Sequence, residues 1–359
     1  MVLEGAGSPA EVNLKSHDVV NMRMARHAGA KVLLAGDIDR GGVFASFVGT
    51  MEVMEEWERA LVAGFVVNRF RGRQDLLGDA IDYVRRFTGV PTLGVVPFLR
   101  NLGLPEEDSV SFKEIRSPGR KAELCVVAVD LPHISNFTDL DALGLEPDVD
   151  LRIARTPRDL DGADAIILPG SRNVFADLDY LWSSGMAQAV LASKAEIVGV
   201  CGGLQMLGTD ITDPALVESE GACARPLGFL PLATQMAVDK VLCQANCVHL
   251  PSGETIRGYE IHHGRTCVLD GQVEPLVTRA DGTVIGWGRA DGMVWGTYLH
   301  GIFDADGFRR FFLDRLRVRK GLDPLKSVQV AYDLEAALDR LASVVRESLD
   351  MERIYRLLD

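Results

Sequence analysis

The segment GVCGGLQMLG occupies residues 199–208 and follows the apolar run AEIV. Its first half has the spacing G-x-C-x-G, formed by Gly199, Cys201 and Gly203. This spacing matches the G-x-S-x-G turn, in which a strand passes sharply into a helix and the glycines leave room for a strained nucleophile. The start of the helix would favour the thiolate form of Cys201. The segment therefore predicts an α/β sheet with a reactive thiol at a strand end, and the alternative is a buried structural cysteine.

Strand-like and helical patterns alternate on both sides of this turn. The apolar runs are residues 31–39, 61–70 and 91–99 in the first part of the chain, and 124–131, 163–171, 196–201 and 292–300 in the second. Such alternation predicts parallel sheets with helices on their faces. The charged stretch 112–123 contains a Pro-Gly turn and has the composition of a linker. We expect one α/β domain at residues 1–115, a second at 121–320 and a helical tail at 321–359.

The composition excludes several classes of protein. The 359 residues carry a formal net charge of −13, whereas a nucleic-acid-binding protein would be expected to show a basic domain or patch. No apolar run approaches the roughly 20 residues of a membrane span, and no signal-peptide pattern opens the chain. We therefore expect a cytoplasmic protein without nucleic-acid or membrane partners. In that compartment its six cysteines would be reduced.

A thiol nucleophile needs a base, and His300 is the best candidate among seven histidines. It ends the apolar run 292–300, so the carboxyl end of its strand should reach the same sheet edge as Cys201. His262 and His263 are secondary candidates. The backbone N–H of Gly202 could bind an oxyanion, and a second donor could come from the glycine turn at 168–173, at Gly170 or Ser171.

Several motifs together resemble a known family. GVCGGLQMLG and WGTYLHGIFD resemble the class I glutamine amidotransferases, in the branch of cobyric acid synthase and cobyrinic acid a,c-diamide synthase. The segments EGAGSPAEVNL, DIDRGGVFAS, VVNRFRG, LPGSRN and GYEIHHGRT also resemble stretches of that branch, in the same order and over nearly the whole chain. DIDRGGVFAS favours cobyric acid synthase over the a,c-diamide enzyme.

The resemblance implies a fold and a reaction. It implies a dethiobiotin-synthetase-like P-loop NTPase sheet followed by a flavodoxin-like amidotransferase domain. The implied activity is ATP-driven amidation of carboxylates b, d, e and g of adenosylcobyrinic acid a,c-diamide, with glutamine as the ammonia source. Cys201 would be the nucleophile and His300 its base. ATP and Mg²⁺ would be co-substrates, and no tightly bound cofactor is expected. The alternatives are the a,c-diamide synthase and a non-catalytic α/β binding protein.

The resemblance also implies residues for the synthetase half. Glu4, Asp37 and Asp39 would lie near Mg²⁺ and the substrate, with Glu4 and Asp37 as metal ligands, and Asn68 would contact adenine. We expect the protein to supply no cationic partner to these acids. A phosphate loop of the form G-x-x-x-x-G-K-[ST] does not occur in the printed sequence. Because VLEGAG, residues 2–7, has the pattern of a buried strand ending in a glycine loop, we expect a first domain that lacks its beginning and an incomplete synthetase half.

A second departure concerns the residue that orients His300. Most triad amidotransferases carry a glutamate two residues after the histidine, and Ile302 stands at that position here. The sequence therefore predicts a Cys-His dyad, with Asp304 or Glu260 as candidates for the group that orients the imidazole.

Overall fold

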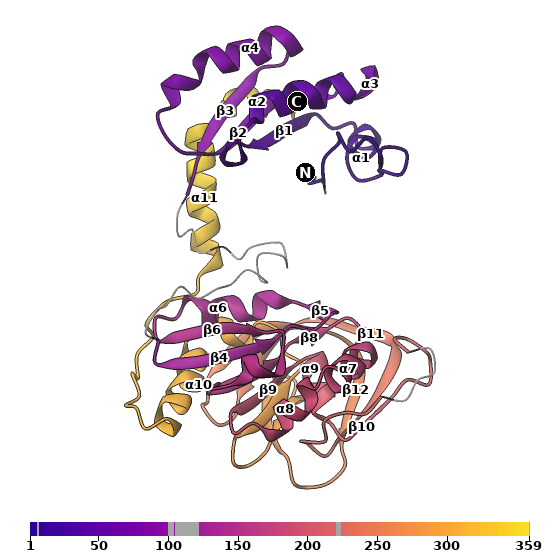
Figure 1. Ribbon diagram of the computed structural model, residues 1–359, viewed down its shortest axis with the longest axis vertical. Coiled ribbons are helices and arrows are strands. Elements are labelled where there is room, and N and C mark those ends of the chain that lie inside the picture. The colour runs from indigo at the N-terminus through magenta and orange to yellow at the C-terminus, as the bar shows by residue number, and fades with distance from the viewer. Residues whose placement is uncertain (6, 100–103, 105–121, 220–223, 359) are drawn as a thin grey trace. The chain divides into compact units, whose positions relative to one another are not determined.

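The structure is a computed structural model that describes residues 1–5, 7–99, 104, 122–219 and 224–358 (Figure 1). Its contacts divide the chain into two units, Met1–Leu104 together with Asp333–Asp359, and Pro105–Tyr332. This division differs from the boundaries expected from the sequence, since the last helices belong to the first unit. Most of the expected linker at 112–123 lies outside the described residues.

The first unit is built on a three-stranded parallel sheet in the order β1–β2–β3. The strands are β1 (Val32–Asp37), β2 (Val62–Phe70) and β3 (Thr92–Pro97). The helices are α1 (Met22–His27), α2 (Val43–Val53), α3 (Glu56–Arg59), α4 (Gly78–Thr88), α11 (Leu334–Ser348) and α12 (Met351–Arg356). The stacked rings of Phe47 and Phe65, 4.6 Å apart, lie in the core. The expected strand–helix alternation is thus confirmed for this unit.

Two features of the first unit differ from expectation. Val2 and Leu3 are exposed and belong to no strand, so the predicted strand end at VLEGAG is not found there. The predicted tail helices form, but they pack on β3: the N–H of Asp350 donates to the carbonyl of Leu93 at 2.7 Å. A Cβ on Gly94 would overlap the carbonyl of Ser348, so glycine is what allows this close approach.

The second unit contains a ten-stranded mixed sheet. Its parallel part has the order β15–β9–β7–β4–β6, and the strands are β15 (Val294–Thr297), β9 (Glu196–Val200), β7 (Ala165–Leu168), β4 (Leu124–Val129) and β6 (Val149–Ala154). The remaining strands are β10 (Asp210–Thr212), β11 (Leu232–His249), β12 (Thr255–Val268), β13 (Glu274–Arg279) and β14 (Val284–Gly288). The central strands are buried on both faces, as their continuous apolar runs predict.

Helices and a small second sheet complete this unit. The helices are α6 (Asp141–Leu145), α7 (Val174–Ser183), α8 (Met186–Ala192), α9 (Gly202–Leu207) and α10 (Asp306–Arg319). Strand β5 (Ile134–Ser135) pairs with β8 (Gly170–Ser171) beyond the ends of β4 and β7. Buried ion pairs hold α10 in place, among them Arg309 with Glu146 at 2.8 Å and Arg310 with Asp148 at 3.1 Å.

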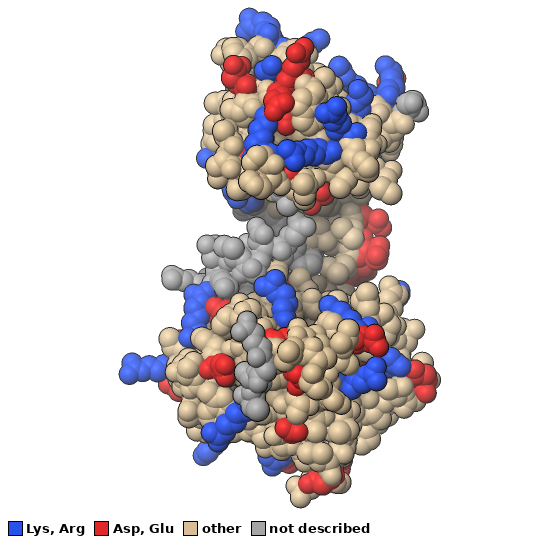
Figure 2. Space-filling view, turned by 90° about the vertical axis from the view of Figure 1, so that its right-hand side faces the viewer, with Lys and Arg blue, Asp and Glu red and all other residues tan. Residues whose placement is uncertain are grey.

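The distribution of charged side chains on the surface is the last feature of the fold. Figure 2 shows basic and acidic side chains mixed on the face of the second unit that it presents. Among the described residues, no helix combines the length and the apolar character that crossing a membrane requires.

Candidate active site

Cys201 stands at the sharp turn between β9 and α9. Its backbone has φ 51° and ψ −107°, a conformation that residues with a side chain rarely adopt. The glycines around it are required by packing: a Cβ on Gly203 would overlap the carbonyl of Leu168, and one on Gly199 would lie 2.6 Å from the Gly203 backbone. The sequence-predicted elbow therefore forms, and it places the thiol at the carboxyl edge of the parallel strands.

His300 reaches the same edge because β15 runs parallel to β9 and is its direct neighbour. Its side chain is fully buried, and it lies near enough to Cys201 for the thiol to raise the pKa of its imidazole. The ring of Tyr259 stacks on it with centroids 5.1 Å apart. The amide nitrogen of Asn136 lies 3.0 Å from Nε2. The structure thus brings together the two residues that the sequence paired across 99 positions.

The group that orients His300 is Asp139, in a short 3₁₀ helix at Phe137–Leu140. Its Oδ2 lies 2.7 Å from His300 Nδ1, and its Oδ1 accepts the Gly301 N–H at 2.7 Å. Neither sequence candidate has this role. Glu260 instead pairs with His262 at 3.2 Å and Arg279 at 3.1 Å. Asp304 approaches Gly301, and no contact of the described residues joins it to the His300 ring.

The surroundings of His300 favour its charged form. Burial alone would lower the pKa of its imidazole, but the hydrogen bond and negative charge of Asp139, together with the neighbouring Cys201 thiol, outweigh burial and raise the pKa to about 10. With its Nδ1 directed at Asp139, the ring keeps Nε2 as its second nitrogen for proton transfer. The imidazole is therefore held in its protonated form beside the thiol.

The residues predicted to bind an oxyanion lie beside this pair. A Cβ on Gly202 would stand 2.9 Å from the backbone nitrogen of Ser171, and a Cβ on Gly170 would stand 3.1 Å from Cε1 of His300. Strand β8 therefore runs closely past the turn at Cys201. The arrangement places backbone of both predicted donor segments next to the thiol.

His262 and His263 do not act on the thiol directly. His262 stacks on Tyr298 at 3.8 Å and bonds the carbonyl of Gly264, while His263 bonds the carbonyl of Ala237. The Cys201 sulfur instead meets the carbonyl of Ile261, the residue directly before His262, at 3.5 Å. Both histidines thus hold the backbone near the site through hydrogen bonds to carbonyl groups.

The predicted nucleotide residues are partly brought together in the first unit. Asp37 and Asn68 are register partners at the carboxyl ends of β1 and β2. Two of the three acids have cationic partners, contrary to expectation: Asp39 pairs with Arg71 at 2.9 Å, and Asp37 lies 3.6 Å from Arg69.

The structure does not bring the predicted magnesium ligands Glu4 and Asp37 together. Glu4 is exposed, and no contact of the described residues joins it to Asp37 or Asp39. Within the described part of the chain, no three His, Cys, Asp or Glu side chains are grouped so that they could hold a metal ion. The role of Glu4 and Asp37 at Mg²⁺ therefore stays a prediction.

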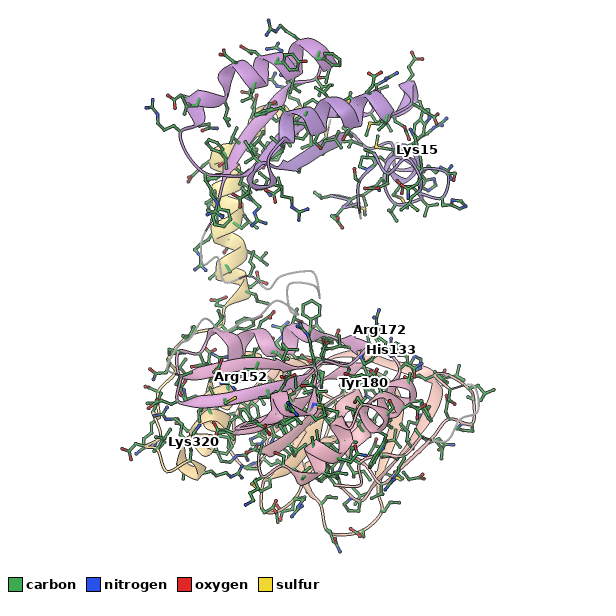
Figure 3. The ribbon with its side chains drawn as sticks, in the orientation of Figure 1. Lys15, His133, Arg152, Arg172, Tyr180 and Lys320 are labelled. Carbon is green, nitrogen blue, oxygen red and sulfur yellow. The ribbon has the colours of Figure 1, made fainter. Side chains whose placement is uncertain are left out.

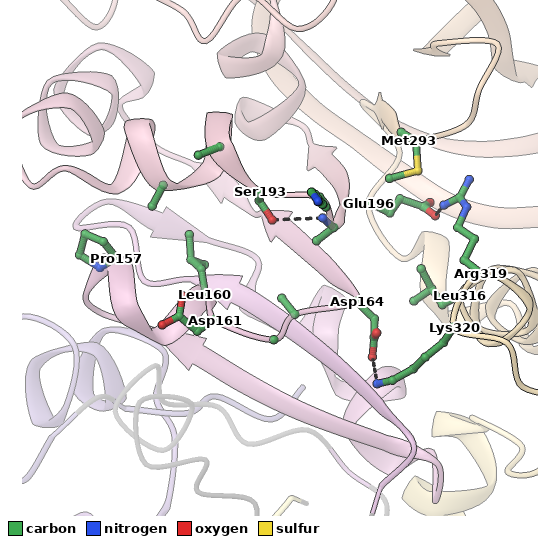
Figure 4. A pocket seen from close by; sticks show the side chains of 16 residues that line it. Pro157, Leu160, Asp161, Asp164, Ser193, Glu196, Met293, Leu316, Arg319 and Lys320 are labelled. Carbon is green, nitrogen blue, oxygen red and sulfur yellow. Dashed lines mark hydrogen bonds and ion pairs between the residues drawn. The ribbon is translucent and has the colours of Figure 1, made fainter.

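A separate cavity of about 550 Å³ lies at the opposite edge of the second unit's sheet (Figure 4). Asp164 directly precedes β7 and Glu196 begins β9, so the cavity opens at the amino ends of these strands. Four of its charged side chains are paired, Asp164 with Lys320 at 2.6 Å and Glu196 with Arg319. It is therefore distinct from the site at Cys201.

Comparisons with known proteins show the family of the chain. The family model described as the CobB/CobQ-like glutamine amidotransferase domain matches residues 125–308, and a model described as an AAA domain matches residues 1–106. Cobyric acid synthase of Nitratidesulfovibrio vulgaris is 54% identical, over 100% of this chain and 74% of that protein. Cobyric acid synthase of Carboxydothermus hydrogenoformans is 43% identical, with the same coverage. The adenosylcobalamin biosynthesis bifunctional protein CobDQ of Leptospira interrogans is 48% identical, over 100% of this chain and 42% of that protein.

Proposed function

The chain belongs to the cobyric acid synthase family, and we propose that it hydrolyses glutamine at Cys201 and His300 to supply ammonia for the amidation of a corrinoid. It is an amide ligase whose second unit is a glutamine amidotransferase domain. The observation that carries the proposal is a thiol on a strained turn at the same sheet edge as a buried imidazole that Asp139 holds.

The proposed reaction begins at the side-chain amide of glutamine. The Cys201 thiolate attacks the amide carbon, and the oxyanion accepts hydrogen bonds from the backbone N–H groups of Gly202 and of the Gly170–Ser171 segment. The His300 imidazolium protonates the departing ammonia and then, as a neutral base, activates the water that hydrolyses the glutamyl thioester. Asp139 holds the ring in one orientation and stabilises its charged form throughout.

The first unit is proposed to serve the ATP-dependent step. Its match to an AAA domain and its parallel sheet support ATP as a co-substrate, with Asn68 beside adenine at the carboxyl edge. The acceptors proposed from the resemblance are carboxylates b, d, e and g of adenosylcobyrinic acid a,c-diamide. The a,c-diamide synthase reaction is the second candidate, favoured only by the chemistry that both enzymes share.

Isotope transfer tests this proposal. Glutamine labelled with ¹⁵N in its side-chain amide is incubated with the protein, with and without MgATP and each corrinoid. We expect labelled ammonia in every reaction. Labelled amides on the a,c-diamide in the presence of MgATP would show that the synthetase half acts as well, contrary to the incomplete half expected from the sequence. Labelled amides on cobyrinic acid instead would favour the second candidate, and the absence of labelled ammonia would contradict the glutaminase assignment.

A further inference from the structure

Asp177, on α7, is a buried carboxylate that the proposed chemistry does not use. Its side chain has no exposed surface, and a buried charge is costly unless hydrogen bonds satisfy it. Three bonds do so. Its Oδ2 accepts the Ser171 hydroxyl at 2.6 Å, and its Oδ1 accepts the His133 backbone N–H at 3.1 Å and lies 2.9 Å from His133 Nδ1.

These bonds join two loops that follow neighbouring strands. His133 belongs to the loop after β4, and Ser171 to the loop after β7. The loops also pair through β5 and β8, and the Arg172 N–H donates to the His133 carbonyl at 2.9 Å. His133 and Arg172 accordingly appear next to each other in Figure 3. The strand pairing between the two loops is only two residues long on each side, so the hydrogen bonds of Asp177 add substantially to their connection.

Both loops carry groups that surround the Cys201–His300 pair. The loop after β4 leads to Asn136, which lies 3.0 Å from His300 Nε2. The loop after β7 holds Gly170 and Ser171 against Gly202 and His300. An oxyanion donor must lie within about 2.7–3.1 Å of the developing charge, so even a small displacement of this backbone would lower the rate. A hydrogen bond from Ser171 to a buried, immobile side chain such as Asp177 would prevent such a displacement.

We propose that Asp177 is a positioning residue, which fixes the Gly170–Ser171 backbone so that it can bind the oxyanion formed from glutamine. This proposal rests on the proposed glutaminase function. Asp177 acts through Ser171 and His133 and does not touch the reacting atoms. It does not set the charge of the thiol, because its bonds run to the loops and not to Cys201 or His300.

The test compares two reactions of the same thiol in Asp177→Ala, Asp177→Asn and wild type. Glutaminase turnover needs the oxyanion site. Alkylation of Cys201 by iodoacetamide, followed by peptide mass spectrometry, needs only an accessible thiolate. The matched control is Asp179→Ala, which removes an exposed carboxylate from the same helix. Cys201→Ala controls for the proposed function, because turnover that persists in it would overturn the glutaminase assignment and not the role of Asp177.

We expect Asp177→Ala to lower kcat by about 10²-fold or more, the effect of losing one oxyanion donor, and to change the alkylation rate less than threefold. Asp177→Asn should recover part of kcat, since its amide can still bond both loops. A kcat within threefold of wild type in Asp177→Ala would overturn the proposal, as would a parallel fall in alkylation. If Asp177→Ala does not fold, kcat and the alkylation rate are compared between Asp177→Asn and wild type instead. A tenfold fall in kcat with an unchanged alkylation rate supports the proposal, and a kcat equal to that of wild type overturns it.

Discussion

Replacing Asp139 by asparagine should disable the glutaminase while leaving the fold intact. The carboxylate accepts from two N–H groups, one on each oxygen, at 2.7 Å. An asparagine side chain has only one oxygen, so its NH₂ group must face either Nδ1 of His300 or the N–H of Gly301. In the first case the imidazole loses the acceptor that fixes its tautomer, and in either case it loses the neighbouring negative charge.

The size of the effect follows from the pKa of His300. A rise from the ordinary 6.5 to about 10 corresponds to roughly 5 kcal/mol of preferential stabilisation of the imidazolium, at about 1.4 kcal/mol per pKa unit. Asp139 and Cys201 share that stabilisation. If Asp139 supplies about half of it, its loss should lower kcat by roughly 30- to 150-fold, which overlaps the usual range of about 10² to 10⁴ for general acid–base help.

The assay is ammonia release from glutamine as a function of pH, with Asp304→Asn and Glu260→Gln as controls that remove the other nearby carboxylates. Because the imidazolium persists only below its pKa, the alkaline limb of the Asp139→Asn profile should move to lower pH. Both controls should keep kcat within a few-fold. A kcat within threefold of wild type in Asp139→Asn, or an equal loss in Asp304→Asn, would refute this role for Asp139.

Two further predictions concern stability. Burial, together with the charges of Asp213 and Asp177, raises the pKa of Glu218 to about 7. Because this value lies above the ordinary 4.5, the ionisation of Glu218 destabilises the fold as pH rises from 4.5 through 7. Glu218→Gln should therefore raise Tm at pH 8 and leave it nearly unchanged at pH 4.5. Arg309→Met leaves Glu146 buried without its main partner and should cost about 3–5 kcal/mol in urea unfolding, against less than about 1 kcal/mol for the exposed Arg289→Met, and equal losses would contradict this.

The parts of the site that could be predicted depend on local signals. Gly199 and Gly203 show that a sharp turn surrounds Cys201, and an apolar run that ends at His300 places that residue at a strand end. Both signals lie within a few residues of the group that they predict. Parallel strands then bring the two strand ends to one edge of the sheet, so the proximity of Cys201 and His300 can be predicted without knowing how side chains pack. The family resemblance drawn from the motifs is confirmed by the relatives.

The parts that were missed depend on long-range packing. Asp139 is 161 positions from His300 and lies in a loop with other acids, so no spacing distinguishes it. The arginines beside Asp37 and Asp39 follow from strand register and rotamers, which a pattern does not contain. The helix at Leu334–Ser348 was predictable from its periodicity, but an apolar stripe indicates only that some surface covers it, and not that the surface is β3.

The central claim is that Cys201, activated by His300, is the nucleophile that attacks glutamine. The most direct test is labelling with a glutamine-analogue electrophile, followed by peptide mass spectrometry of all six cysteines. The account predicts a single adduct on Cys201, protection by excess glutamine, and a labelling rate at least about 10²-fold lower in His300→Ala than in wild type or in His263→Ala. An adduct on another cysteine, or a Cys201→Ala variant that still releases ammonia from glutamine, would contradict it.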